Sequence, residues 1–198
     1  MSLSPFVKKR LEEEFRIATS KNSPDRTVAP LKDGDLLVWR AYLRGHDETL
    51  HSFEIRIGRK FPLEPPEVEC LTPLSHPNIE PPRPEGLGRV CLPWISDSRV
   101  WSPQTRINAI VDGLVYLLNN PNPCDPLMHS RCLEEAMKMI QQKINESKSL
   151  DDKLRAHAES LLVTARRLLS QGSNDKAHEL TKQVCLMIQK HEKIKWDR

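Results

Sequence analysis

Two residue types that together suit acyl transfer lie near each other in the sequence, Asn78 and Cys91. A cysteine can take an acyl group as a thioester and pass it to an amine, because its thiolate is both a strong nucleophile and a good leaving group. The tetrahedral state of such a transfer carries negative charge on oxygen, which a neutral asparagine amide can stabilise. A lone cysteine after a valine is, however, more often a small core residue. Both interpretations of Cys91 stand on the residues alone.

Strand-like segments precede this pair. The residues from Ser52 to Ile57 alternate apolar and polar side chains, which is the period of a half-buried antiparallel strand, and Leu36 to Leu43 reads as another strand. Val68 and Cys70 continue the sheet, so Cys70 is expected in the core. The prolines between Phe61 and Pro66 lack the donor that a strand ladder needs. This stretch is therefore predicted to be an ordered, extended surface loop.

A helix is predicted at the N-terminus. Ser4 followed by Pro5 is a helix start, with serine as the N-cap and proline in the first helical position. A polar loop from Ser20 to Arg26 follows this helix. The apolar positions that recur at helical spacing are Val7, Leu11, Phe15 and Ala18. The basic run from Lys8 to Arg10 lies mostly outside this stripe, as a solvated face.

A second, central helix is predicted later in the chain. Ser102 and Pro103 repeat the pattern of a cap followed by proline. The run from Asn120 to Pro123 ends the helix, because the residue before a proline avoids helical angles. A further helix is expected over roughly Ser130 to Ile144. The apolar stripe that buries the central helix consists of Ile107, Ile110, Val111, Leu114, Leu117 and Leu118.

The last quarter of the chain predicts a helical hairpin. Ser149 with Asp152 three positions later resembles a capping box, and the run Gly172-Ser173-Asn174 separates two helical patterns. We expect a main domain over residues 1–147 and an appended αα unit over 148–198 with one apolar seam. The seam positions are Leu150, Leu154, Ala158, Leu161, Ala165, Leu168, Ala177, Leu180, Val184 and Ile188. Packing against the main domain and recruiting a partner are both open as its role.

Composition narrows the class of protein. The 198 residues carry 30 Lys and Arg against 27 acidic residues, and a net charge of +3 gives no strong nucleic-acid footprint. No apolar run is long enough to span a bilayer, and the N-terminus has none that marks a signal peptide. We therefore expect a cytoplasmic protein with neither a nucleic acid nor a membrane as partner.

The five cysteines are odd in number and widely spread. This favours reduced thiols over a disulfide framework. Cys124, His129 and Cys132 form an alternative zinc-ligand set, but their spacing is not that of a zinc finger and no second pair follows. No metal is expected.

Five motifs taken in order resemble the ubiquitin-conjugating enzyme family. They are FPLEPPEV (61–68), HPNI (76–79), GRVCL (88–92), WSP (101–103) and NPNPCDPL (120–127). The resemblance covers roughly residues 4 to 145. It implies an α+β fold in which a four-stranded antiparallel meander is combined with N-terminal, central and C-terminal helices.

The resemblance also implies an activity. The chain would accept ubiquitin or a ubiquitin-like protein from an activating enzyme as a thioester on Cys91, then transfer it to a substrate lysine, usually with a RING-type ligase. Asn78 would support the transition state, Asp125 would lie near the incoming lysine, and the motif residues His76 and Pro77 would be structural. No cofactor is implied. The residues that would meet the ligase or the activating enzyme are Leu63, Trp101, Ser102, Pro103, Lys8, Lys9 and Arg10.

A carboxylate near a lysine raises the pKa of the amine, so Asp125 cannot activate it by charge. Positioning the amine by a hydrogen bond is the more coherent role.

Three features depart from the family pattern. Asn78 and Cys91 lie 13 positions apart (91 minus 78), which is several more than the family usually shows, and the extra loop holds Pro81, Pro82, Pro84 and Gly86. Pro93 stands where an acidic residue is common, and Ser75 where a tyrosine is common. These departures bear on which modifier and which acceptor the chain prefers.

Two rival functions remain. A non-catalytic binding module of the same fold would characteristically lack the cysteine that this chain has at Cys91. A cysteine hydrolase would need a histidine base beside the thiol, whereas His76 lies in a motif whose family role is structural.

Overall fold

The computed structural model describes residues 3–83, 88–96 and 99–192, which group into two compact units. Unit 1 comprises Met1–Leu74 and Pro81–Asn119, and unit 2 comprises Ser75–Glu80 and Asn120–Arg198. Pro84 and Gly86, noted above for their place between Asn78 and Cys91, lie outside the described residues. In the described part of the chain, no helix is both long and apolar enough to cross a membrane.

Unit 1 contains an antiparallel sheet with the strand order β1-β2-β3-β4-β5. Its elements are α1 (Pro5–Thr19), β1 (Arg26–Lys32), β2 (Asp35–Arg44), β3 (Leu50–Arg56), β4 (Glu67–Cys70), β5 (Gly88–Arg89), α2 (Pro93–Ser96) and α3 (Ile107–Asn119). The expected meander is thus confirmed and gains a fifth strand of two residues. The segment predicted to be a polar loop ends where β1 begins. Pro30 in β1 interrupts the pairing register there, which is tolerated because β1 is an edge strand.

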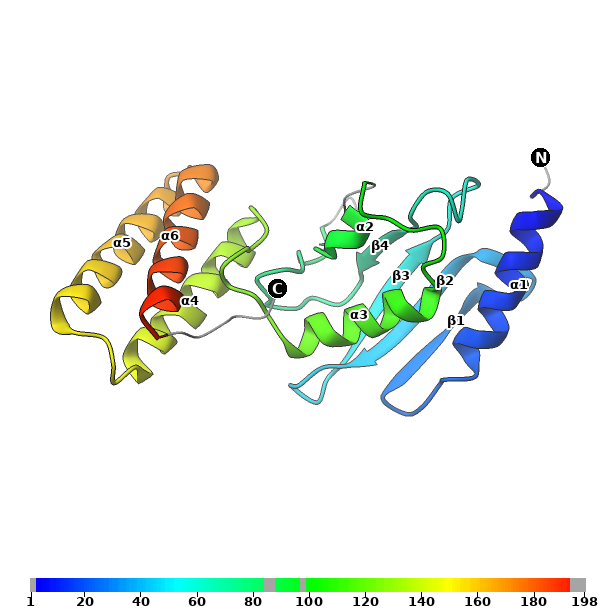
Figure 1. Cartoon of the computed structure of the whole chain (residues 1–198), viewed down its shortest axis with the longest axis horizontal. Coiled ribbons are helices and arrows are strands. Elements are labelled where there is room, and N and C mark those ends of the chain that lie inside the picture. Colours follow the sequence, from blue (N-terminus) through cyan, green and yellow to red (C-terminus); the bar gives the residue numbers. More distant parts are fainter. Residues whose placement is uncertain (1–2, 84–87, 97–98, 193–198) are drawn as a thin grey trace. The chain divides into compact units, whose positions relative to one another are not determined.

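One face of the sheet forms the core of unit 1. Trp39 pairs with Ile55 and Ala41 with Phe53, and all four side chains are fully buried. The apolar stripe of α3 is buried in full, and Figure 1 shows this helix lying along the sheet. The opposite face carries a ladder of ion pairs, in which Arg40 contacts Glu54, Glu54 contacts Arg56, and Arg56 contacts Glu69.

Both helix starts were tested by the structure. Ser4 is the N-cap of α1, and its hydroxyl accepts a hydrogen bond from Val7 N at 3.3 Å. The second prediction was wrong, because α3 begins at Ile107. The Ser102 hydroxyl instead accepts from Gln104 N at 3.3 Å, which closes a local turn rather than opening a helix.

Unit 2 packs three helices around a second core. The helices are α4 (Ser130–Glu146), α5 (Asp152–Ser170) and α6 (Asn174–Glu192), and Figure 1 shows α5 and α6 as a hairpin. Gly172 turns the chain between them with a φ of 77°, a value that favours glycine. The predicted capping box of Ser149 and Asp152 was wrong, because Asp151 is the N-cap of α5 and its side chain accepts from Leu154 N. The core side chains from α4 are Leu133, Met137, Ile140 and Ile144, and they pack with Ala158, Leu162, Ala165, Ala177, Val184 and Ile188.

The expectation of reduced thiols was wrong for two cysteines. Cys124 and Cys185 form a disulfide with a Cα–Cα distance of 5.2 Å, although they lie 61 positions apart. The packing of α6 brings them together, and no local spacing signals such a pair. Cys124 is bonded to Cys185, and Cys132 donates to Ile79 O. The two cysteines of the alternative zinc-ligand set, Cys124 and Cys132, are therefore engaged with other groups.

Candidate active site

Cys91 lies at the centre of a tight turn in unit 1. It follows β5 by two residues and precedes α2, and Leu92 N donates to Val90 O at 3.2 Å across it. A hydrogen bond from residue i+2 to residue i is that of a γ-turn, which is common at the ends of strands. The Cys91 side chain is half-buried. The turn therefore places a partly accessible thiol in unit 1.

The residues after Cys91 pack against α3 at Gly113. A Cβ built on Gly113 would overlap the ring of Trp94 and would lie 3.6 Å from Leu92 Cδ2. Leu92 is also buried. The absence of a side chain at Gly113 thus lets the segment after the cysteine lie directly on the helix.

The other cysteines differ from Cys91 in their surroundings. Cys70 and Cys132 are buried, and Cys124 and Cys185 are in the disulfide. Burial raises the pKa of the Cys70 thiol to about 11, so this thiol is almost never ionised near neutral pH. Among the described cysteines, Cys91 alone is neither buried nor oxidised.

The motif residues His76, Pro77 and Asn78 lie in unit 2. Asn78 N donates to His76 Nδ1 at 3.0 Å, and Leu127 N donates to Pro77 O at 2.8 Å. His76 is buried, and its Nδ1 is occupied as an acceptor. This arrangement suits a histidine that shapes the loop, as the family resemblance implies, better than a general base.

The Asn78 side chain holds the segment from Asn120 to His129, which we call the acceptor loop. Its Nδ2 donates to Asn122 O and to Asp125 O, both at 3.0 Å, and its Oδ1 accepts from Asn122 N at 2.8 Å. An amide nitrogen has two hydrogens, so both are engaged. Asn78 is buried and braces the acceptor loop in this conformation. As an oxyanion donor it would have to exchange one of these bonds.

Asp125 lies on the acceptor loop with its carboxylate toward solvent. The side chain is 66% exposed, and its Oδ1 is 3.9 Å from Lys182 Nζ of α6. Its backbone oxygen meanwhile accepts from Asn78. The carboxylate is thus presented outward from a braced backbone.

Leu63 and Pro103 lie on two loops that are hydrogen-bonded together within unit 1. Leu63 is 74% exposed, and its neighbour Pro62 accepts a 2.7 Å hydrogen bond from Trp101 Nε1 through its backbone oxygen. Trp101 is buried, and its ring lies 6.5 Å from that of Phe61. Pro103 is exposed. The structure therefore brings together the predicted ligase residues, with Trp101 as their internal support.

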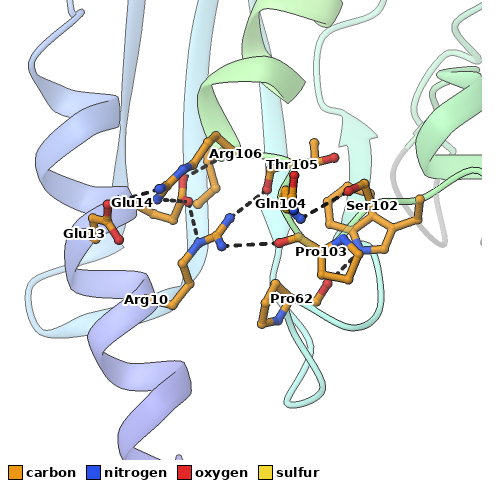
Figure 2. Close-up of polar contacts among 11 residues, drawn as sticks. Arg10, Glu13, Glu14, Pro62, Ser102, Pro103, Gln104, Thr105 and Arg106 are labelled. Carbon is orange, nitrogen blue, oxygen red and sulfur yellow. Dashed lines mark hydrogen bonds and ion pairs between the residues drawn. The ribbon is translucent and has the colours of Figure 1, made fainter.

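Among the three neighbouring basic residues Lys8, Lys9 and Arg10 on α1, Arg10 differs from the other two. Lys8 and Lys9 are exposed, whereas Arg10 donates to Pro103 O at 3.3 Å and to Thr105 O at 2.9 Å, as Figure 2 shows. Its guanidinium also lies over the ring of Phe61. Arg10 therefore joins α1 to both loops.

Glu14 completes this network and was missed in the sequence. Its fully buried carboxylate pairs with Arg10 at 2.7 Å and Arg106 at 3.1 Å, and accepts from Ile107 N at 2.9 Å (Figure 2). The Arg106 guanidinium also lowers the pKa of the Glu13 carboxyl. Glu14 lies three positions after Leu11 on the buried stripe, so an acidic residue at an apolar position was the available signal.

Comparison with known protein families assigns the chain to a family. Residues 10–150 match the sequence profile described as ubiquitin-conjugating enzyme. The chain belongs to the ubiquitin-conjugating enzyme family. The conjugating-enzyme match includes the motifs around Cys91, Asn78 and Asp125 and ends near the start of α5.

Individual conjugating enzymes show how far the likeness extends. The chain is 31% identical over 127 residues to "Ubiquitin-conjugating enzyme E2 T" of Bos taurus, covering 60% of this chain and 62% of the relative. It is 44% identical over 75 residues to a Nedd8-conjugating enzyme of Drosophila melanogaster, covering 38% of each. The chain thus spans less than two thirds of these relatives.

A solved structure supports the fold. A ubiquitin-conjugating enzyme E2 domain from Toxoplasma gondii superposes with a TM-score of 0.55 at 25% identity, covering 69% of this chain and 88% of that one. The expected conjugating-enzyme fold is confirmed.

Proposed function

We propose that this chain carries ubiquitin or a ubiquitin-like protein as a thioester on Cys91 and transfers it to a lysine amine. The observation that supports this most strongly is the setting of Cys91, a half-buried thiol on a tight turn in a chain of the conjugating-enzyme family. Both modifier classes stay open, because the relatives include enzymes named for ubiquitin and for Nedd8.

The reaction has two acyl transfers. The Cys91 thiolate attacks the thioester carbonyl held by an activating enzyme, whose own thiolate leaves with the electron pair. A lysine amine then attacks the Cys91 thioester, the Cys91 thiolate leaves, and the proton lost from nitrogen passes to solvent. ATP is used upstream by the activating enzyme, so this chain needs no cofactor of its own.

On the acceptor side we assign roles to Asn78 and Asp125. Asn78 keeps the acceptor loop in shape through its three side-chain hydrogen bonds, and exchange of one of them would release a donor for the oxyanion. The exposed Asp125 carboxylate orients the incoming amine by a hydrogen bond. It does not lower the pKa of the amine, because a nearby negative charge favours the ammonium form.

Partner binding is proposed for the surface around Leu63, Ser102 and Pro103, with a RING-type ligase as the partner. Lys8 and Lys9 are proposed to contact the activating enzyme or a ligase. Arg10, which we expected beside them, supports this surface from within through its bonds to Pro103 and Thr105. A cytoplasmic location and the separation of residues 1–147 from 148–198 also remain proposals.

A charging assay tests the proposal. The full chain is incubated with Mg-ATP and either ubiquitin with its activating enzyme or Nedd8 with its own, then run on gels with and without reductant. A band shifted by one modifier and lost on reduction is expected with at least one pair. No band with either pair would contradict the conjugating function and favour a binding module. Hydrolysis of a modifier ester with no lysine product would favour a cysteine hydrolase.

A further inference from the structure

Helix α6 is joined to the acceptor loop at three points within unit 2. Cys185 is disulfide-bonded to Cys124, Lys182 Nζ lies 3.9 Å from Asp125 Oδ1, and Asn174 Nδ2 donates to Met128 O at 3.1 Å. These contacts fall on positions 124, 125 and 128 of the loop. One of them is made by the Asp125 carboxylate, which the proposed function places at the incoming lysine. The C-terminal hairpin therefore contacts the part of the fold assigned to the acceptor.

The disulfide and the ion pair act on the same pair of segments. Lys182 and Cys185 are three positions apart on α6, so they are neighbours on the helix surface. On the loop, Cys124 and Asp125 are adjacent. The disulfide between Cys124 and Cys185 therefore keeps the ammonium group of Lys182 near the carboxylate of Asp125. This tether raises the local concentration of the ammonium group at the carboxylate.

The acceptor loop does not depend on α6 alone for its shape. The Asn78 side chain makes three hydrogen bonds to the loop backbone, and Pro77 O accepts from Leu127 N. If the contacts from α6 are lost, these bonds remain. Opening the disulfide removes the covalent tie between α6 and the loop, while Val184 and Ile188 keep α6 packed in the core of unit 2. Lys182 then holds the Asp125 carboxylate by the ion pair alone, and the acceptor loop keeps its shape.

We propose that Lys182, held in place by the Cys124–Cys185 disulfide, is a built-in competitor of the acceptor lysine at Asp125. Lys182 is 42% exposed and Asp125 is 66% exposed, so the contact can be displaced by an incoming amine. This inference rests on the proposed function, which assigns Asp125 to the acceptor. The competitor weakens when the disulfide is reduced.

The redox step is an exchange with a small thiol such as glutathione. One thiolate attacks Cys124 Sγ, which belongs to the more exposed of the two residues, and the Cys185 thiolate leaves. A second glutathione thiolate resolves the mixed disulfide, so two electrons pass to the protein and one glutathione disulfide forms. The reverse exchange closes the bond. A disulfide in a cytoplasmic protein is most often one that changes state in this way.

The test measures lysine discharge in the full chain with substitutions, because a reductant would also cleave the thioester at Cys91. Each variant is charged, further charging is stopped by removing ATP, and loss of the modifier to free lysine is timed. Cys124→Ser/Cys185→Ser and Lys182→Gln should each discharge about two to five times faster than the wild type, the range expected for an exposed ion pair. Combining all three substitutions should give no further gain, since they remove one contact.

Lys176→Gln is the matched control, because it removes an exposed lysine from the same helix, and it should discharge like the wild type. Discharge of Cys124→Ser/Cys185→Ser or Lys182→Gln at or below the wild-type rate would overturn the proposal. Conjugation of the modifier to Lys182 itself, seen by mass spectrometry, would also overturn it, because the amine would then be an acceptor.

Alkylation of the denatured wild type tests for the disulfide without an activity assay. Protein purified without reductant should take up three alkyl groups, at Cys70, Cys91 and Cys132, and five after reduction. Five before reduction would remove the disulfide from the account. If the wild type fails to charge, the proposed function fails, whereas normal charging with unchanged discharge in the variants defeats only the competitor role.

Discussion

The carboxylate of Glu14 occupies the start of α3, where its Oε2 accepts a 2.9 Å hydrogen bond from Ile107 N across 93 positions of sequence. The first N–H groups of a helix have no partner within the helix, so a buried side chain from α1 performs the role of an N-cap here. Through Arg10 the same carboxylate is linked to the loop that presents Pro103. One buried acid therefore connects the N-terminal helix, the central helix and the proposed ligase surface.

Glu14→Gln is expected to destabilise the fold by about 1.5 to 3 kcal/mol, the range for losing hydrogen bonds to a charged group. The glutamine would keep the shape but lose the charge that Arg10 and Arg106 share. Chemical denaturation measures the change, with Glu12→Gln on the exposed side of α1 as control. Equal unfolding free energies for the two variants would show that the charge of Glu14 contributes nothing to stability.

Leu63→Ala should reduce ligase-stimulated discharge while leaving charging intact. An apolar residue on a supported loop is suited to insert into a partner pocket, and truncating such an anchor costs about 1 to 2 kcal/mol, or roughly tenfold in binding. Discharge is timed with and without a ligase. Leu31→Ala, which truncates an exposed leucine on β1, should leave both rates unchanged. A parallel fall in charging and stimulation by Leu63→Ala would point to misfolding instead.

Gly113→Ala should slow charging, because the added Cβ overlaps the Trp94 ring, and displacing this ring disturbs the packing of the segment after Cys91 on α3. Overpacking of this kind costs about 1 to 3 kcal/mol in stability. Misplacement of a reacting group by about 1 Å lowers rates by up to ~10²-fold. The initial charging rate is the measurement. Gly58→Ala is the control, since a Cβ added at Gly58 would have no atom within 4 Å. Equal charging rates for both variants would show that charging does not depend on the packing of the segment after Cys91 on α3.

The sequence predicted well where the cause of a structure is local. Ser4 caps α1 as expected, and the stripe from Ile107 to Leu118 is buried, because both depend on neighbours within a few turns. It failed where the cause lies far away in the chain. The start of α3 depends on Glu14, and the oxidised state of Cys124 depends on Cys185. Arg10 looked like a surface cation for the same reason, since its acceptors are near Pro103.

Asn78→Ala is expected to charge but to discharge slowly. Losing the brace removes three partly buried hydrogen bonds, at about 1 kcal/mol each. Losing an oxyanion donor in other enzymes lowers rates by ~10² to 10³. Asn78→Asp keeps the acceptor for Asn122 N and loses both Nδ2 donors, so its thermal unfolding shows how much the two donated bonds contribute to the brace. Discharge to free lysine and thermal unfolding are followed together. Normal discharge by Asn78→Ala would remove this residue from the reaction.

The central claim is that the modifier is carried on Cys91, and the chemistry of the bond tests it directly. Wild type, Cys91→Ser and Cys91→Ala are charged in parallel, exposed to a small thiol, and mapped by mass spectrometry of their peptides. The account predicts a wild-type adduct on Cys91 that the thiol removes, a Cys91→Ser oxyester that resists the thiol or no adduct at all, and none on Cys91→Ala. An adduct on Cys91→Ala at the wild-type level, removed by the thiol in the same way, would contradict the account.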